Sequence, residues 1–248
     1  MELGFLTAAP IAHRALHDRA IGRTENGLLA VEAAMARGYG IEVDVTASAD
    51  AVPMVFHDGR LDRLTDERGP LAARPAAALA RIRLKGTRET IPTLNDLLAL
   101  VAGRVPLLVE VKATAAPGPF EAAIADAVRA YKGPLALMSF NPFTMGAFVE
   151  AVPQVPRGQV ACRHTGYPAR FGIGHKVALQ HLLYNHVSRP HFVAYEAEEA
   201  RRPAPQIVRK AGLPLLVWTV RSPGAAALAR QHADNIIFEG FEPPGRAA

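Results

Sequence analysis

Cysteine is almost absent from this chain of 248 residues. Its single cysteine, Cys162, can form no intramolecular disulfide and cannot build a thiolate metal site. That usage is compatible with a reducing compartment. Because Cys162 follows the apolar pair Val160-Ala161, we interpret it as a buried structural residue and not as a nucleophile.

Long hydrophobic runs are also missing. No segment reaches the ~18 consecutive apolar residues that a membrane-spanning helix needs, so we expect no integral membrane segment. Glu2 stands in the opening hexapeptide, where a secretory signal would carry a basic region. We therefore expect a soluble protein of the cytoplasm.

Aromatic residues and lysines are scarce as well. Aromatic residues make up 6% of the chain, and the net charge of +5 comes mostly from arginine, because only five of the 28 basic residues are lysines. Arginine suits phosphate groups, and a basic balance can favour anionic partners. The arginines are nevertheless scattered with few aromatic residues between them, so nucleic-acid binding is not expected.

What the sequence does contain is an alternation of short apolar runs and alanine-rich stretches. It is 50% hydrophobic, and no linker, low-complexity tract or long repeat divides it, so we predict one domain over residues 1–248. The apolar runs predict strands at 11–13, 41–46, 107–111, 135–139, 159–161, 192–195, 215–219 and 235–238. The stretches between them predict helices at 27–37, 120–131, 144–152, 176–187, 205–211 and 224–231.

Apolar strands that alternate with helices predict a parallel sheet covered by helices. Eight such strands within about 230 residues favour an α/β fold of the (β/α)8 TIM-barrel type over an open doubly wound sheet, whose G-x-G-x-x-G motif is missing before the first helix. Because the chain stops about ten residues after the last strand, the final helix is expected to be short or absent. Residues 52–57 predict an additional strand or hairpin.

Charged residues interrupt the apolar strands at alternate positions. Glu42 and Asp44 lie two residues apart in one predicted strand, and Glu110 and Lys112 lie two apart in the next. Residues two apart on a strand share a face, and in a TIM barrel the C-terminal strand ends face the active site. Buried acids need partners, so they form a salt-bridge network or a metal site. Three converging carboxylates favour one divalent cation, Mg²⁺ or Ca²⁺ and alternatively Mn²⁺.

Two histidines end strands beside these acids. His13 closes the first predicted strand, and His57 closes the additional one. A single histidine there is most often a hydrogen-bonded structural residue, but a pair suits general acid–base catalysis near neutral pH. The other seven histidines are interpreted as solvated or structural, with His17 the first candidate for an exception.

The order of these residues resembles that of the glycerophosphodiester phosphodiesterase family. The shared motifs are His13-Arg14, Glu25-Asn26, Glu42-Val43-Asp44-Val45, Val52-Pro53-Met54-Val55-Phe56-His57-Asp58, Leu61, Arg63, Thr65, Ile91-Pro92-Thr93-Leu94, Glu110-Val111-Lys112, Ser139-Phe140 and Val217-Trp218-Thr219-Val220. Any one of them is weak evidence, whereas the ordered series is specific and spans nearly the whole chain.

The resemblance implies a TIM barrel that uses a divalent metal to hydrolyse small-molecule glycerophosphodiesters to glycerol 3-phosphate and an alcohol. Carried over residue by residue, it implies metal ligands (Glu42, Asp44, Glu110), an acid–base pair (His13, His57) and substrate-binding residues (Arg14, Lys112, Trp218). Arg14 and Lys112 would hold phosphate oxygens, and Trp218 would wall the glycerol pocket. The nucleophile could be water or the neighbouring glycerol hydroxyl.

Three features depart from the family pattern. Ala15 stands where the family usually has glycine, Glu239 ends the last strand in place of Thr-Asp, and Asn26 is followed by Gly27 but can still cap the next helix. These departures bear on the choice of alcohol. One alternative is a lysophospholipase D-like enzyme, which an apolar insertion at the barrel mouth would favour and for which Pro142-Phe143 is the only candidate. Another is a non-catalytic barrel that binds phosphorylated ligands.

Overall fold

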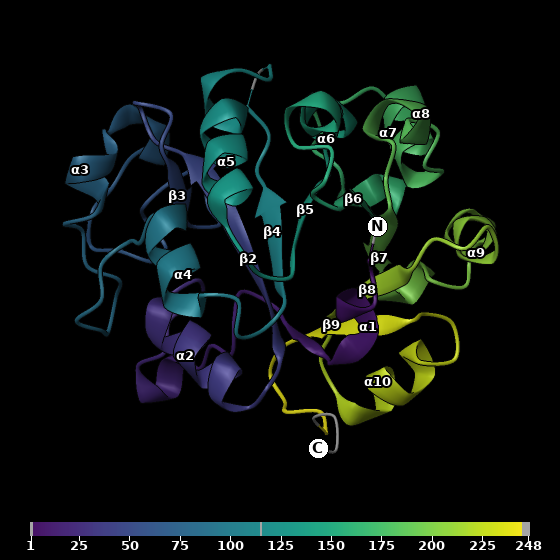
Figure 1. Ribbon diagram of the computed structural model, residues 1–248, viewed down its shortest axis with the longest axis horizontal. Coiled ribbons are helices and arrows are strands. Elements are labelled where there is room, and N and C mark those ends of the chain that lie inside the picture. Colours follow the sequence, from purple (N-terminus) through teal and green to yellow (C-terminus); the bar gives the residue numbers. More distant parts are fainter. Residues whose placement is uncertain (1, 115, 245–248) are drawn as a thin grey trace.

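Eight parallel strands close into a barrel in the computed structural model, which describes residues 2–114 and 116–244 (Figure 1). The barrel strands are β1 (Ile11–Ala12), β2 (Gly40–Ala47), β4 (Leu107–Val111), β5 (Leu135–Ser139), β6 (Arg157–Ala161), β7 (Phe192–Glu196), β8 (Leu215–Val220) and β9 (Asn235–Phe238). Because β1 pairs with both β2 and β9, the sheet has no gap between its first and last strands. The predicted TIM barrel is confirmed, and no strand end differs from the prediction by more than two residues.

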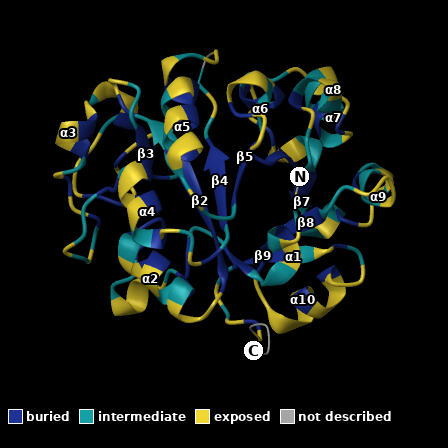
Figure 2. Cartoon of the chain, in the orientation of Figure 1, coloured by how far each residue is buried: buried dark blue, intermediate teal, exposed yellow. Residues whose placement is uncertain are grey.

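Helices surround the barrel and turn buried residues inward and exposed residues outward (Figure 2). They are α1 (Phe5–Ala8), α2 (Leu28–Ala36), α3 (Ala76–Leu79), α4 (Leu94–Val101), α5 (Pro119–Ala130), α6 (Pro142–Ala151), α7 (Ile173–Gln180), α8 (Asn185–Ser188), α9 (Pro203–Lys210) and α10 (Pro223–Ala229). Of these, α3 packs in the connection between β2 and α4. The helix predicted at 176–187 is wrong as one element, because the chain turns between α7 and α8, where Leu182 has a φ of 58°. Residues 239–244, described after β9, contain no helix, as predicted.

The barrel strands divide their side chains between two apolar cores. In β2 and β4, Val43 and Val111 pack outward under the helices, as the alternation predicts. Leu108 faces the interior of the barrel, where it joins the side chains of Phe192 and, from α1, Leu6. The barrel interior near the N-terminal strand ends is therefore a packed apolar core. Charged residues occupy the inward positions nearer the C-terminal strand ends.

A long connection between β2 and α4 forms a small subdomain beside the barrel. It begins with β3 (Pro53–Val55), which runs antiparallel to β2 and confirms the predicted additional strand. The connection has an apolar core of its own, in which Phe56 and Leu61 are fully buried. That core fixes the position of His57 at the edge of the barrel mouth.

Candidate active site

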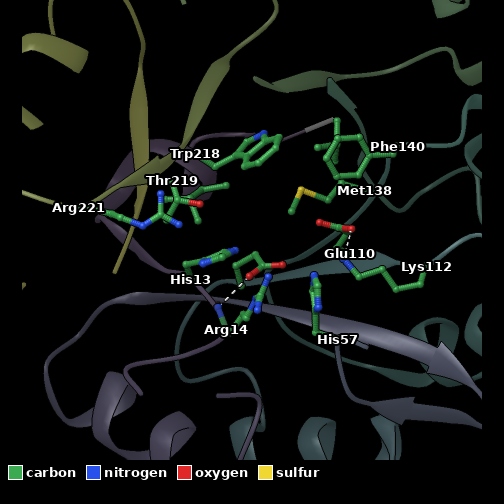
Figure 3. A pocket seen from close by; sticks show the side chains of 13 residues that line it. His13, Arg14, His57, Glu110, Lys112, Met138, Phe140, Trp218, Thr219 and Arg221 are labelled. Carbon is green, nitrogen blue, oxygen red and sulfur yellow. Dashed lines mark hydrogen bonds and ion pairs between the residues drawn. The ribbon is translucent and has the colours of Figure 1, made fainter. Parts of the chain in front are cut away.

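The C-terminal strand ends surround a cavity of about 230 Å³. Seven of the eight predicted site residues line it: His13, Arg14, Glu42, His57, Glu110, Lys112 and Trp218 (Figure 3). The eighth, Asp44, is 1% exposed and lies directly behind this lining in contact with Lys112. The sequence therefore identified a set of residues that the fold brings to one place.

The three predicted metal ligands form one buried cluster. Glu42 and Asp44 come from β2, and Glu110 comes from the neighbouring β4, where it is the register partner of Asp44. Each offers a carboxylate oxygen, and these oxygens lie within 4.8 Å of one another. Asn26 holds the Asp44 backbone and side chain in place, because its Oδ1 accepts from the Asp44 N–H and its Nδ2 donates to Asp44 Oδ2, both at 3.0 Å.

The expectation that Asn26 caps the following helix is wrong. The N-cap of α2 is Gly27, which has no side chain to accept a backbone N–H. Asn26 instead turns its amide toward the strand, from a left-handed conformation with a φ of 60° that asparagine tolerates better than most residues. Its role is to orient an acid of the cluster.

The electrostatics of the cluster fit a bound cation. Burial, together with the charges of Asp44 and Glu110, raises the pKa of Glu42 well above its ordinary value. Within the described part of the chain, Glu42 Oε1 is buried without a hydrogen-bond partner. Burial opposes ionisation of Asp44 too, but Lys112, His57 and Arg14 hold its pKa well below the usual range. An unpartnered carboxylate oxygen beside two further acids is the kind of donor set that Mg²⁺ or Ca²⁺ prefers.

The two predicted phosphate-binding cations are engaged with these acids. Lys112 Nζ lies 2.6 Å from Asp44 Oδ1 and also contacts Glu110, and these two acids raise the pKa of Lys112 although burial opposes the charge. Arg14 donates its backbone N–H to Glu42 Oε2 at 2.8 Å, while its Nε, 3.5 Å from Asp44 Oδ2, has no hydrogen-bond partner among the described residues. The structure thus contains the salt-bridge network and the metal-type cluster at once.

A carboxylate holds each of the two histidines by its Nδ1 atom. His13 Nδ1 lies 2.6 Å from Glu239 Oε2, and His57 Nδ1 lies 2.7 Å from Asp58 Oδ1. An ionised carboxylate only accepts, so Nδ1 carries the proton and Nε2 is left for the cavity. Figure 3 shows His13 and His57 on either side of the Arg14 side chain.

The carboxylates behind the histidines are ionised under ordinary conditions. The hydrogen bond from His13 and the nearby His17 imidazole keep the pKa of Glu239 far below its usual range, against the effect of burial, and Arg221 Nε donates to the same carboxylate at 2.7 Å. Burial would raise the pKa of Asp58, but hydrogen bonds from Arg63 and His57 lower it to about 2.

Sequence reasoning missed these supporting residues. Arg63 comes from the subdomain and donates to both Asp58 and Glu25, and Glu25 also pairs with Arg14 at 2.8 Å. The chain Asp58–Arg63–Glu25–Arg14 therefore links the subdomain to the barrel. The motifs around Glu25 and Arg63 were available as signals, but no spacing rule connects residues that meet only after folding.

Aromatic side chains close the other side of the cavity. The rings of Trp218 and Phe140 meet edge to face with centroids 5.4 Å apart, across the cavity from His57 (Figure 3). Trp218 Nε1 is buried and has no hydrogen-bond partner within the described residues.

A second hollow, of about 540 Å³, adjoins the cavity and shares Glu110, Lys112 and Phe140 with it. Its larger apolar residues, which we call the apolar groove, are Phe140, Pro142, Phe143, Tyr167, Phe171 and Leu179. The expectation that Pro142-Phe143 is the only apolar feature at the barrel mouth is therefore wrong. The loop between β6 and α7 adds Tyr167 and Phe171, which no periodicity connects with Phe143.

Two minor predictions are also answered. Cys162 is buried, as predicted, and burial raises the pKa of its thiol to about 12, which disfavours the thiolate that a nucleophile needs. His17 Nε2 lies 3.8 Å from Glu239 Oε2, beside the site but not among the residues that line the cavity, whereas His175 lines the second hollow.

The chain belongs to the Glycerophosphoryl diester phosphodiesterase family, whose sequence profile matches residues 13–239. Glycerophosphodiester phosphodiesterase 1 from Bos taurus is 37% identical over 100 residues, which are 36% of this chain and 29% of that protein. The match thus spans less than a third of the curated relative.

Two solved structures share the fold. A phosphodiesterase from Oleispira antarctica, in complex with the product sn-glycerol-3-phosphate, has a TM-score of 0.74 at 24% identity and covers 92% of this chain and 91% of its own. A glycerophosphodiester phosphodiesterase from Agrobacterium tumefaciens has a TM-score of 0.69 at 23% identity, and the match covers 92% of this chain and 94% of that one.

Across the described residues, the helices are too short or too polar to cross a membrane.

Proposed function

We propose that the chain is a metal-dependent phosphodiesterase that hydrolyses glycerophosphodiesters to glycerol 3-phosphate and an alcohol. One observation carries the proposal: three buried carboxylates, two carboxylate-held histidines and two cations meet at one cavity of the barrel. Membership of the family and the product bound in the Oleispira antarctica structure support this choice of substrate.

The charges of the site suit a phosphodiester. Glu42, Asp44 and Glu110 would hold the divalent cation, which when bound would neutralise and polarise a phosphate oxygen. Counted by themselves, the three acids, the divalent cation, Lys112 and Arg14 sum to one net positive charge. A phosphodiester carries one negative charge, so its charge matches the site better than that of a doubly charged phosphate monoester.

The two histidines divide the proton transfers between them. In the reaction the nucleophile's oxygen bonds to phosphorus, the P–O bond to the alcohol breaks, and the departing alkoxide takes a proton. One histidine accepts the proton of the nucleophile at Nε2, and the other donates a proton to the alkoxide. Glu239 and Asp58 keep both rings oriented for this exchange. Lys112 and Arg14 stabilise the charge that gathers on the phosphate oxygens.

The test is release of glycerol 3-phosphate from a panel of glycerophosphodiesters, with choline and neutral alkyl esters among them, by the purified chain. We expect EDTA to abolish turnover and Mg²⁺, Ca²⁺ or Mn²⁺ to restore it. His13→Ala and His57→Ala should each lower kcat by on the order of 10²–10⁴-fold with little change in Tm. The matched control is His181→Ala, an exposed histidine of the same chain. Full turnover in metal-free buffer, or binding of glycerol 3-phosphate without any turnover of diesters, would contradict the proposal.

A further inference from the structure

We propose that the apolar groove binds the alcohol end of the substrate and selects neutral, apolar alcohols over cationic ones such as choline and ethanolamine. This inference rests on the proposed phosphodiesterase activity and names its preferred substrate class. It follows from the position of the groove, the residues that line it and the charges that face it.

The position of the groove assigns it to one end of the substrate. The groove and the cavity meet at Glu110, Lys112 and Phe140, where the phosphate-binding cation and one metal-type ligand lie (Figure 3). A phosphodiester has two ester arms, so a phosphate at this junction directs one arm into each space. The cavity of about 230 Å³ is the smaller of the two, and the groove of about 540 Å³ accepts a larger group.

The polar groups decide which arm enters which space. The cavity offers the side chains of Thr219 and Arg221 beside the Trp218 ring, and these two polar groups can bind the free hydroxyl groups of glycerol. The groove offers mainly aromatic and aliphatic surface, against which hydroxyl groups would lose their hydrogen bonds to water. Glycerol therefore belongs in the cavity and the alcohol in the groove.

The walls of the groove come from two separate segments. Phe143 stands in the first turn of α6 and is 50% exposed, and its ring centroid lies 6.0 Å from that of Tyr184. Tyr167 and Phe171 come from the connection between β6 and α7, and Tyr167 contacts Phe140 edge to face at 6.1 Å. An exposed phenylalanine beside a catalytic cavity gains stability when a ligand covers it, because apolar surface is then removed from water.

The charges in the groove disfavour a cationic alcohol. Among the described residues that line it, the charged ones are Glu110, Lys112 and Arg170. Glu110 is already paired with Lys112, and the guanidinium carbon of Arg170 lies 5.3 Å from the ring centroid of Phe171. The ring of Phe171 could otherwise attract a quaternary ammonium group, but it already faces a cation, and no unpaired acid is present in this lining to attract another. A neutral alcohol meets no such repulsion.

Two esters of the same shape test the inference directly. The choline and 3,3-dimethylbutyl esters of glycerol 3-phosphate differ in one atom, a positively charged nitrogen in the first and a neutral carbon in the second. We expect kcat/KM to be at least tenfold higher for the neutral ester. Choline is the more acidic alcohol and the better leaving group, so intrinsic reactivity works against this result. In a series of n-alkyl esters, kcat/KM should rise by up to about fourfold for each methylene until the groove is filled.

Variants of the groove separate it from general effects on activity. Phe143→Asn should lower kcat/KM more for the neutral ester than for the choline ester, so that their ratio falls toward one, while Phe143→Leu should keep the ratio high. Arg170→Gln should raise kcat/KM for the choline ester and leave kcat/KM for the neutral ester unchanged. Ile207→Asn is the matched control, because Ile207 on α9 is 64% exposed and lies outside the groove, and its ratio should equal that of the wild type.

The outcomes distinguish this inference from the function on which it rests. Equal kcat/KM for the two esters, or an unchanged ratio in Phe143→Asn, overturns the inference and leaves the phosphodiesterase intact. An increase in kcat/KM that is confined to substrates with the hydrocarbon chain on glycerol, such as lysophospholipids, also overturns the inference. The groove would then hold the glycerol arm of the substrate and not the alcohol. No hydrolysis of any ester with any of the three metals overturns the proposed function and the inference together.

Discussion

Replacing Glu42 by glutamine should stabilise the metal-free protein, and this follows from the arrangement of the acids. Lys112 bridges Asp44 and Glu110, whereas Glu42 Oε1 has no partner within the described residues. Glu42 therefore experiences the repulsion of the cluster with less compensation than its neighbours. Glu42→Gln removes that charge, keeps the shape of the side chain and leaves an amide oxygen that can still accept from the Arg14 N–H.

The magnitude can be estimated from the separation of the carboxylates. Two charges 4.8 Å apart repel by roughly 3.5 kcal/mol at an effective dielectric constant of about 20. The variant also lacks the attraction between the Glu42 charge and Lys112 and Arg14. We therefore expect Glu42→Gln to raise the free energy of unfolding by a net amount of roughly 1–3 kcal/mol. For a chain of this size that corresponds to a rise in Tm of about 2–4 °C per kcal/mol.

The stability that Glu42→Gln gains over the wild type should depend on pH. The pKa of Glu42 is raised in the folded state, so the fold favours the protonated carboxyl. The wild type consequently has its full stability below the unfolded pKa of Glu42 and loses stability as the pH rises through the folded pKa. Glu42→Gln lacks this loss, and the difference in Tm between the two proteins should grow from pH 5 to pH 9 in EDTA.

The assay is thermal unfolding with and without a divalent cation. At a cation concentration 100 times its Kd, the wild type should gain about 2.7 kcal/mol, and Glu42→Gln should gain far less, so that the cation reduces or reverses the order of stability. The matched control is Glu121→Gln, another buried acid, which accepts from the Gly118 N–H at 2.8 Å and should lose stability with its response to the cation unchanged. A Glu42→Gln variant that is less stable than the wild type in EDTA at pH 9 would refute the reasoning.

Three further predictions concern the surroundings of the cluster. Ala15 has a φ of 64°, so Ala15→Gly should raise the free energy of unfolding by up to about 1 kcal/mol in a denaturant titration, and a loss of stability would contradict this. Lys112→Met should lower kcat/KM and raise the inhibition constant of glycerol 3-phosphate; equal constants would leave Lys112 only as a partner of Glu110. Because the pKa of Asp58 is about 2, the wild type should lose stability between pH 4 and pH 2, and Asp58→Asn should flatten that part of the profile in acid unfolding.

The barrel could be predicted because its strands are apolar on both faces. Runs such as Leu107–Val111 are buried throughout, which is typical of parallel sheets and is visible in the sequence without any tertiary information. The missed helix α4 also had a local signal, since the Thr93 hydroxyl and the Asp96 carboxylate form a capping box at its first turn. The break between α7 and α8 had none, because the left-handed residue there is a leucine.

The acids of the site could be predicted for a different reason. A period of two sends Glu42 and Asp44 to the same side of β2, and the pairing of neighbouring strands then brings Glu110 beside them. The partners of the histidines could not be found in this way. Glu239 reaches His13 only because β9 pairs with β1 and closes the barrel, over a separation of 226 residues.

The reactive groups of the site could be predicted from local patterns, whereas the residues proposed to set its specificity could not. Reactive groups stand at strand ends, where the hydrogen-bond ladder fixes their spacing and a local pattern reveals them. The proposed site for the alcohol end of the substrate is formed by side chains from the first turn of α6 and the loop after β6, and their mutual position depends on how Phe143 and Phe171 pack against intervening residues. Family motifs therefore identify the reaction of this barrel, and the preference for one alcohol has to be derived from residues such as Phe143 and Arg170 that belong to no motif.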